Sequence, residues 1–264
     1  MCAAWLFATC VAGCSSDNGR SRERPMAPPP SRPVSAPQGA QEAQRAAPAT
    51  PPAGQPKPIL AQKKLYSQNN EELVIRDFFK DRRGGFFLDV GCAWPKQHST
   101  TYYLEKHLGW SGIGVDALSD YGPGWAKARP RSKFFALLVS DKADTKQAFY
   151  KASTTGVSST QQDRMVMGQK VTGKEIKVQT TTLNRLLDDN KVQKVDFLSM
   201  DIEGAEPKAL AGFDIERFKP ELVCIEATPS IRTQVLEYFS AHGYRRLERY
   251  LKHDRVNWYF TPTG

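Results

Sequence analysis

The segment VDFLSMDIEGAE, residues 195–206, is the clearest guide to the architecture of this chain. A short apolar run that ends in polar residues is typical of a buried strand that leaves the core of a parallel sheet. Asp201, Glu203 and Glu206 follow the run, and Pro207 suits the first turn of a helix. The order of strand, acidic turn and helix predicts one βα unit.

Four other apolar runs end in the same way and are expected to be strands: FFLDVG (86–91), GIGVDA (112–117), KFFALLVSD (133–141) and LVCIEA (222–227). Amphipathic segments accompany them at 67–80, at 100–108 and after Ser230, where Gly243 ends the pattern. Because strands that alternate with helices form parallel sheets, we expect an α/β fold.

Two regions depart from this alternation. Residues 145–180 are rich in Ser, Thr, Gln and Gly, and we expect hairpins there with a mobile substrate-side loop at 154–173. The last two runs, 244–252 and 256–260, are separated by only three residues, which predicts an antiparallel hairpin. In the first of these strands, alternation would turn Leu247 and Leu251 inward and Tyr250 outward.

The first 61 residues differ in composition from the rest. Of 18 prolines, 11 lie in residues 1–60, and the remaining 7 are spread over 204 residues. Residues 1–14 resemble a secretory leader, and Val11–Cys14 is similar to a bacterial lipobox, which predicts lipidation at Cys14. Residues 15–61 are expected to be a disordered Pro/Ala-rich tether, and residues 62–264 a folded domain.

This leader leaves two locations open. A signal peptide begins with basic residues, but no Lys or Arg precedes Cys14. Either the start of the protein is misassigned, which favours the cytoplasm, or the lipobox is real and the protein is a membrane-anchored lipoprotein. Without such an anchor we expect no membrane contact, because no apolar run reaches the roughly 18 residues of a membrane span.

Charge and cysteines restrict the function further. The formal net charge of +9 permits a nucleic-acid partner, but the basic run 244–255 has mixed sign, so we do not expect one. Cys92 and Cys224 both lie in apolar runs, and two cysteines make neither a disulfide framework nor a zinc site. We expect them to be small buried thiols.

Polar residues gather at the predicted strand ends, where parallel sheets bind ligands: Asp89, Gly91, Asp116, Ser140, Asp141, Asp201, Glu203 and Glu226. The loop 91–99 holds one glycine, which disfavours a pyrophosphate site. S-adenosylmethionine has no phosphate and fits better. Asp116 would accept both ribose hydroxyls, and Ser140 or Asp141 would reach the adenine amine.

The segments FFLDVGCAWPKQHSTTYYLEKHLGWSGIGVDA, TTLNRLLDDNKVQKVDFLSMDIEGAEPKAL and NWYF resemble the FkbM family of S-adenosylmethionine-dependent methyltransferases. The resemblance implies a Rossmann-like, seven-stranded, mostly parallel class I methyltransferase sheet with a C-terminal antiparallel hairpin. It also implies O-methylation of a sugar or another small acceptor. By the same resemblance, Asp89, Gly91 and Asp116 match cofactor positions, and residues 201–204 match the active-site edge. The sequence departs from the family at Trp94, Pro95 and His98.

Methyl transfer to a hydroxyl requires removal of its proton, and the candidate bases are Glu203, Glu206, Asp201 and His98, although Glu206 also suits the first turn of a helix. We favour Glu203, whose alternative role is to hold the turn. No metal is expected, because no histidine or third carboxylate is forced into place beside Asp201 and Glu203. Two other functions remain open: a catalytically inactive, lipid-anchored binding protein and an RNA methyltransferase.

Overall fold

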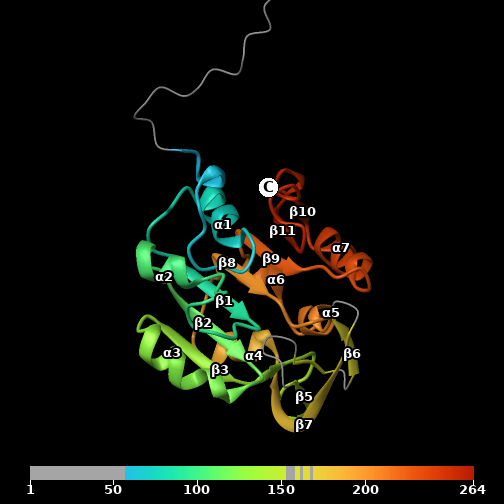
Figure 1. The fold of residues 1–264 in the computed structure, drawn as a ribbon. Helices are drawn as coiled ribbons and strands as arrows, with labels where there is room; N and C mark the ends of the chain where they lie inside the picture. The colour runs from blue at the N-terminus through green and yellow to red at the C-terminus, as the bar shows by residue number, and fades with distance from the viewer. Residues whose placement is uncertain (1–56, 153–157, 161–162, 167–168) are drawn as a thin grey trace, which may run out of the picture. The chain divides into compact units, whose positions relative to one another are not determined.

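A seven-stranded sheet forms the centre of the computed structural model, which describes residues 57–152, 158–160, 163–166 and 169–264. Across the sheet the strands follow in the order β3 (Ser132–Ala136), β2 (Ser111–Asp116), β1 (Phe86–Val90), β8 (Phe197–Met200), β9 (Leu222–Glu226), β11 (Asn257–Pro262) and β10 (Tyr244–Arg246) (Figure 1). Only β11 runs against the other six. The predicted Rossmann-like sheet is therefore confirmed.

Strand β1 lies between β2 and β8, and the strand order reverses beside it. Leu88 pairs with Ile113 of β2 on one side and with Leu198 of β8 on the other, and all three strands are parallel. The chain builds outward from β1 to β3 and then returns to the opposite side of β1 with β8. Ligands of open α/β sheets bind at such a reversal, beyond the carboxyl ends of the strands.

Helices cover both faces of the sheet, because neighbouring residues of a strand point to opposite sides. Phe87 and Phe197 pack with α1 (Glu71–Phe79) and α2 (Tyr102–Leu108). Leu88 and Leu198 pack in a second core with side chains of the helices that follow β7. These helices are α4 (Leu183–Asp189), α5 (Glu206–Leu210), α6 (Ile215–Phe218) and α7 (Arg232–Ala241). In the sequence, α3 (Gly122–Ala128) connects β2 to β3.

The predicted strand 133–141 divides at Leu137. Its second half, β4 (Leu138–Val139), pairs with β7 (Gln169–Thr181) in a separate four-stranded sheet that also contains β5 (Lys146–Ala152) and β6 (Asp163–Val166). β5 and β6 are both antiparallel to β7, so the hairpins expected in residues 145–180 are confirmed. The mobile loop expected at 154–173 is in part wrong, because residues 163–166 and 169–173 belong to β6 and β7. Residues 154–157, 161–162 and 167–168 of it lie outside the described residues.

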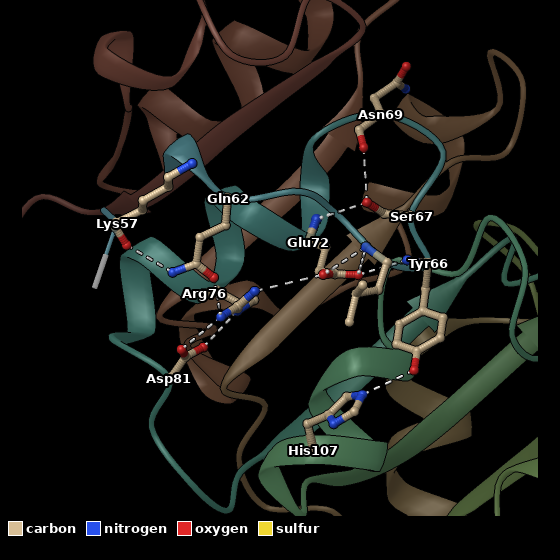
Figure 2. Close-up of polar contacts among 10 residues, drawn as sticks. Lys57, Gln62, Tyr66, Ser67, Asn69, Glu72, Arg76, Asp81 and His107 are labelled. Carbon is tan, nitrogen blue, oxygen red and sulfur yellow. Dashed lines mark hydrogen bonds and ion pairs between the residues drawn. The ribbon is translucent and has the colours of Figure 1, made fainter. Parts of the chain in front are cut away.

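The first helix begins later than the periodicity predicts, at Glu71 in place of Ser67. The carboxylate of Glu72 accepts hydrogen bonds from the backbone N–H groups of Leu65 and Tyr66, which keeps the preceding chain out of the helix (Figure 2). The hydroxyl oxygen of Ser67 accepts a hydrogen bond from the backbone N–H of Glu72. Ser67 thus satisfies a backbone N–H of the first turn of α1 although it lies outside the helix.

The C-terminal hairpin is shorter than predicted. Of the predicted strand 244–252, only Tyr244–Arg246 form a strand that pairs with β11. The chain then forms the 3-10 turn Glu248–Tyr250. This turn breaks the alternation of a strand, so the prediction that Tyr250 faces outward is wrong. Tyr250 is buried, and its hydroxyl donates to Asp77 at 2.8 Å. A tyrosine held in this way offers no exposed ring to a nucleic-acid base.

Several predictions concern the N-terminal part of the chain. Cys14, the leader 1–14 and residues 15–56 of the tether lie outside the described residues, and Ile59–Ala61 form a 3-10 turn. No helix in the part of the chain that the structure describes has the length and apolar character needed to cross a membrane. Cys92 and Cys224 are buried free thiols, as predicted.

Replacing Phe239 with alanine should destabilise the protein by about 3–5 kcal/mol, because it leaves a cavity in the core. Phe239 is fully buried, and its ring stacks on that of Phe260 with the centroids 4.1 Å apart. On the same helix, Leu236 is 42% exposed, and Leu236→Ala should change the free energy of unfolding by less than about 0.5 kcal/mol. Urea unfolding of both variants measures the difference, and equal losses would contradict this packing.

Candidate active site

A pocket lies at the carboxyl ends of β1, β2 and β8, where the strand order reverses. It is concave, opens to solvent and has both polar and apolar residues in its wall, as sites for small molecules do. Six of the residues predicted from the strand ends and the following loop line it: Asp89, Gly91, His98, Asp116, Asp201 and Glu203. The fold therefore brings together residues that are more than 100 positions apart in the sequence.

Gly91 is required by the close approach of two strand ends. Its φ of +79° lies in the left-handed region, and a Cβ at this position would lie 1.8 Å from the carbonyl oxygen of Asp201. The backbone N–H of Asp201 in turn donates to the carbonyl of Val90 at 2.9 Å. Only glycine lets the turn after β1 pass this close to β8.

Asp116 ends β2 and organises the loops on either side of it. One carboxylate oxygen accepts from the backbone N–H of Ala93 at 3.1 Å, and the other accepts from that of Leu118 at 2.8 Å. Burial raises the pKa of Asp116 to about 6, and the nearby Asp89 acts in the same direction, while the two backbone hydrogen bonds oppose them. The carboxylate is held rigidly at the wall of the pocket.

Asp89 belongs to a buried polar network beneath the pocket. It accepts a hydrogen bond of 2.6 Å from the hydroxyl of Thr101, which in turn accepts one from Arg129 at 2.9 Å. Arg129 is fully buried and pairs with Glu105 at 2.6 Å. Burial raises the pKa of Asp89 to about 6, although Thr101 and Arg129 lower it. The network fixes Asp89 between β1 and α2.

Asp201 and Glu203 form the acidic edge of the pocket. The side chain of Asp201 is open to the pocket, but protein atoms surround its carboxyl group on the other sides. Loss of solvation raises its pKa well above the usual range, and the carboxylates of Glu226 and Glu203 add to this effect. Glu203 has a φ of +61°, uncommon for a residue other than glycine, and such strained positions cluster at functional sites.

The loop that departs from the family pattern lines the pocket without filling it. Trp94 is half-buried in the wall, with its ring centroid 5.6 Å from that of His98 and 5.8 Å from that of Tyr121. His98 is exposed, and its backbone forms an isolated parallel bridge with Ser67. The loop therefore connects the N-terminal segment to the pocket.

Ser140 and Asp141, predicted to reach the adenine, are not among the lining residues. The hydroxyl of Ser140 donates to Asp141 at 3.0 Å, and Asp141 is exposed and lies 3.7 Å from Lys208. The pocket wall in this part of the chain consists of the apolar residues 137–139, because β4 has left the main sheet.

The lining residues that the strand-end pattern does not predict include Gln68, Glu71, Tyr121, Phe149, Ser158 and Thr160. The first two come from the segment before β1 and from the start of α1, and the last three from β5 and the chain beyond it. Tyr121 lies in the 3-10 turn Ser119–Tyr121, five residues beyond the end of β2. The other five do not follow a parallel strand, so the rule that ligands bind at strand ends does not find them. The polar Ser/Thr-rich composition of residues 145–180 was the one available signal.

Comparison with known proteins identifies the domain. The model of the methyltransferase FkbM domain matches residues 89–246, more than half of the chain. No curated protein matches the chain.

Three solved structures resemble the fold at low identity. A TehB-like SAM-dependent methyltransferase from Corynebacterium glutamicum is 14% identical, with a TM-score of 0.43, over 76% of this chain and 90% of that one. A SAM-dependent O-methyltransferase from Thermotoga maritima is 9% identical, with a TM-score of 0.41, over 77% and 68%. The fibrillarin pre-rRNA processing protein of Methanococcus jannaschii is 13% identical, with a TM-score of 0.38, over 70% and 69%. Likeness at this level says nothing about the substrate.

Replacing Gly91 with alanine should cost about 1–3 kcal/mol more than the same replacement at Gly84. Both glycines have positive φ, so both variants pay about 1–2 kcal/mol for the left-handed backbone. An added Cβ meets nothing within 4 Å at Gly84, whereas at Gly91 it collides with the Asp201 carbonyl. Urea unfolding of the two variants measures the difference. Equal destabilisation would show that β1 and β8 separate without cost.

Proposed function

Because the chain belongs to the FkbM family of S-adenosylmethionine-dependent methyltransferases, we propose that it methylates a hydroxyl of a sugar or another small acceptor. The observation that carries the proposal is the gathering of Gly91, Asp116, Asp201 and Glu203 around one pocket. We assign two parts of a methyl-transfer site to it: a wall suited to the cofactor and an acidic edge suited to the acceptor.

The residues at the ends of β1 and β2 fit S-adenosylmethionine. The turn at Gly91 lines the pocket, where its backbone can contact the amino-acid moiety, and Asp116 presents two carboxylate oxygens to the ribose hydroxyls. The apolar wall at residues 137–139 suits the adenine ring better than the predicted Ser140 and Asp141. When bound, this cofactor supplies a methyl group activated by a sulfonium.

The acceptor is proposed to lie between the acidic edge and the second sheet. Phe149, Ser158 and Thr160 line the pocket there and combine one apolar ring with two hydroxyls. Such a mixed surface suits a small polar molecule with an apolar face, as sugars have. Tyr250, the central ring of the C-terminal basic run, is buried, which favours a small acceptor over a nucleic acid.

Glu203 is proposed as the base that takes the hydroxyl proton of the acceptor. It lines the pocket together with Asp201. It has a left-handed backbone conformation and lies in the turn before α5, which begins at Glu206. With the cofactor bound, the acceptor oxygen would take the methyl group as the carbon–sulfur bond of the sulfonium breaks and leaves a neutral thioether, and the hydroxyl proton would pass to the carboxylate of Glu203. The wall residues contribute by aligning the acceptor oxygen, which a displacement reaction requires.

Affinity for S-adenosylmethionine should fall about 10-fold between pH 7 and pH 5. With a pKa of about 6, Asp116 is about 90% ionised at pH 7 and about 10% ionised at pH 5, and the protonated form no longer accepts from both ribose hydroxyls. Asp116→Asn should bind about 10-fold more weakly at pH 7 and lose most of the pH dependence. Isothermal titration of the full chain measures both effects.

Asp120→Asn is the matched control, because this acid is exposed and four residues away. Asp89, which shares a pKa of about 6, and Tyr121 face the same region, so a small residual slope is expected in Asp116→Asn. An unchanged slope in Asp116→Asn would contradict the proposed ribose contact. A folded protein that fails to bind the cofactor at any pH would contradict the proposed function.

Replacing Glu203 with glutamine should lower kcat by about 10²–10⁴-fold while KM changes little, because the carboxamide keeps the shape but cannot take a proton. The measurement is transfer of labelled methyl from S-adenosylmethionine to the best acceptor in a panel of monosaccharides and small alcohols. The exposed Glu237→Gln on α7 serves as the control. An unchanged kcat would assign Glu203 to holding the turn.

A further inference from the structure

Three carboxylates from two neighbouring strand ends converge beside the pocket. Asp201 follows β8, Glu206 begins α5 and Glu226 ends β9. One carboxylate oxygen from each lies within 4.8 Å of those of the other two. Two oxygens that share a hard divalent cation lie about 3–5 Å apart, because each is about 2.1–2.5 Å from the ion. The spacing therefore suits a shared ion.

Glu206 has an oxygen that the protein itself leaves unsatisfied. Its side chain is fully buried, and Oε1 accepts from the backbone N–H of Ile202 at 2.8 Å. Oε2 is also buried and has no hydrogen-bond partner. An ionised carboxylate in this position is costly unless a cation or a proton neutralises it. This oxygen is independent of the convergence of the three groups and itself points to a missing partner.

Negative charge gathers around Asp201. Within the described residues, neither Asp201 nor Glu206 forms an ion pair with Lys, Arg or His. The charged neighbours that act most strongly on the carboxyl of Asp201 are four acids, Glu226, Glu203, Glu206 and Glu71, which raise its pKa. A positive ion bound here would relieve the repulsion that these groups impose on one another.

We propose that Asp201, Glu206 and Glu226 bind a hard divalent cation, Mg²⁺ or Mn²⁺, at the edge of the pocket. All three donors are carboxylate oxygens, which these ions prefer, and there is no thiol or imidazole among them to favour zinc or copper. Asp201 lines the pocket, so the ion has a route from solvent and keeps positions for water or for a hydroxyl of a bound molecule.

The absence of a metal was expected from the sequence because no third carboxylate was forced into place beside Asp201 and Glu203. The structure supplies two, Glu206 at the start of α5 and Glu226 from the adjacent strand β9. A cation at Asp201 would lower the pKa of a hydroxyl that binds it, which adds a second means of activating an acceptor. The binding of the ion does not depend on methyl transfer.

Electron paramagnetic resonance of Mn²⁺ titrated into the metal-free full chain tests the proposal without cofactor or acceptor. Wild type should bind about one Mn²⁺ per chain, Mg²⁺ should displace it, and Mn²⁺ should raise Tm. Glu206→Gln and Glu226→Gln should each weaken binding by at least about 10-fold. Glu216→Gln, exposed on α6, is the matched control and should bind as wild type does.

Melting of the metal-free proteins distinguishes the ion from a bound proton. Glu206→Gln keeps the acceptor for Ile202 and removes an unsatisfied charge, so it should melt at the same temperature as wild type or higher. If either variant fails to fold, the other carries the test. The proposal is overturned if wild type binds no Mn²⁺ at millimolar concentration, or if both variants bind it as tightly as wild type. A proton shared among the carboxyl groups would then neutralise the cluster.

Discussion

The close approach of Gly91 to the carbonyl of Asp201 is the constraint on which the site depends. It brings the turn after β1 against the end of β8, with no room for a Cβ between them. Because β1 pairs with both β2 and β8, this contact also sets where Asp116 of β2 lies relative to the acidic turn at Glu203. Because Gly91 has no side chain, the ends of β1 and β8 lie close enough to contribute to the same pocket.

Burial raises the pKa of acidic residues in the pocket wall, which favours a positively charged ligand. Asp89 and Asp116 both have a pKa of about 6, and burial is the main cause in each. A sulfonium or a metal ion stabilises the ionised form of such groups, whereas a phosphate would oppose it. The acidic lining therefore agrees with the single glycine of the loop 91–99 in disfavouring a dinucleotide.

The sequence predicted the sheet and the strand-end acids because both follow from local patterns. Apolar runs that end in Asp89, Asp116 and Asp201 mark buried strands and place their ends at one edge. Glu71 and Gln68 were missed because they reach the pocket through the packing of α1, which no local pattern encodes. The breaks at Leu137 and after Arg246 were missed for a similar reason, since the residues beyond them pair or pack with distant partners.

The attachment of residues 57–70 to α1 gives the pocket a mechanical shield. Glu72 holds the backbone of Leu65 and Tyr66, and Arg76 joins Gln62 to Asp81, so several contacts lie between residue 57 and Gln68 in the pocket wall (Figure 2). A force that pulls on the chain before residue 57 would load these contacts first. Such a force would therefore reach Gln68 in the pocket wall only after the contacts to Glu72 and Arg76 had broken.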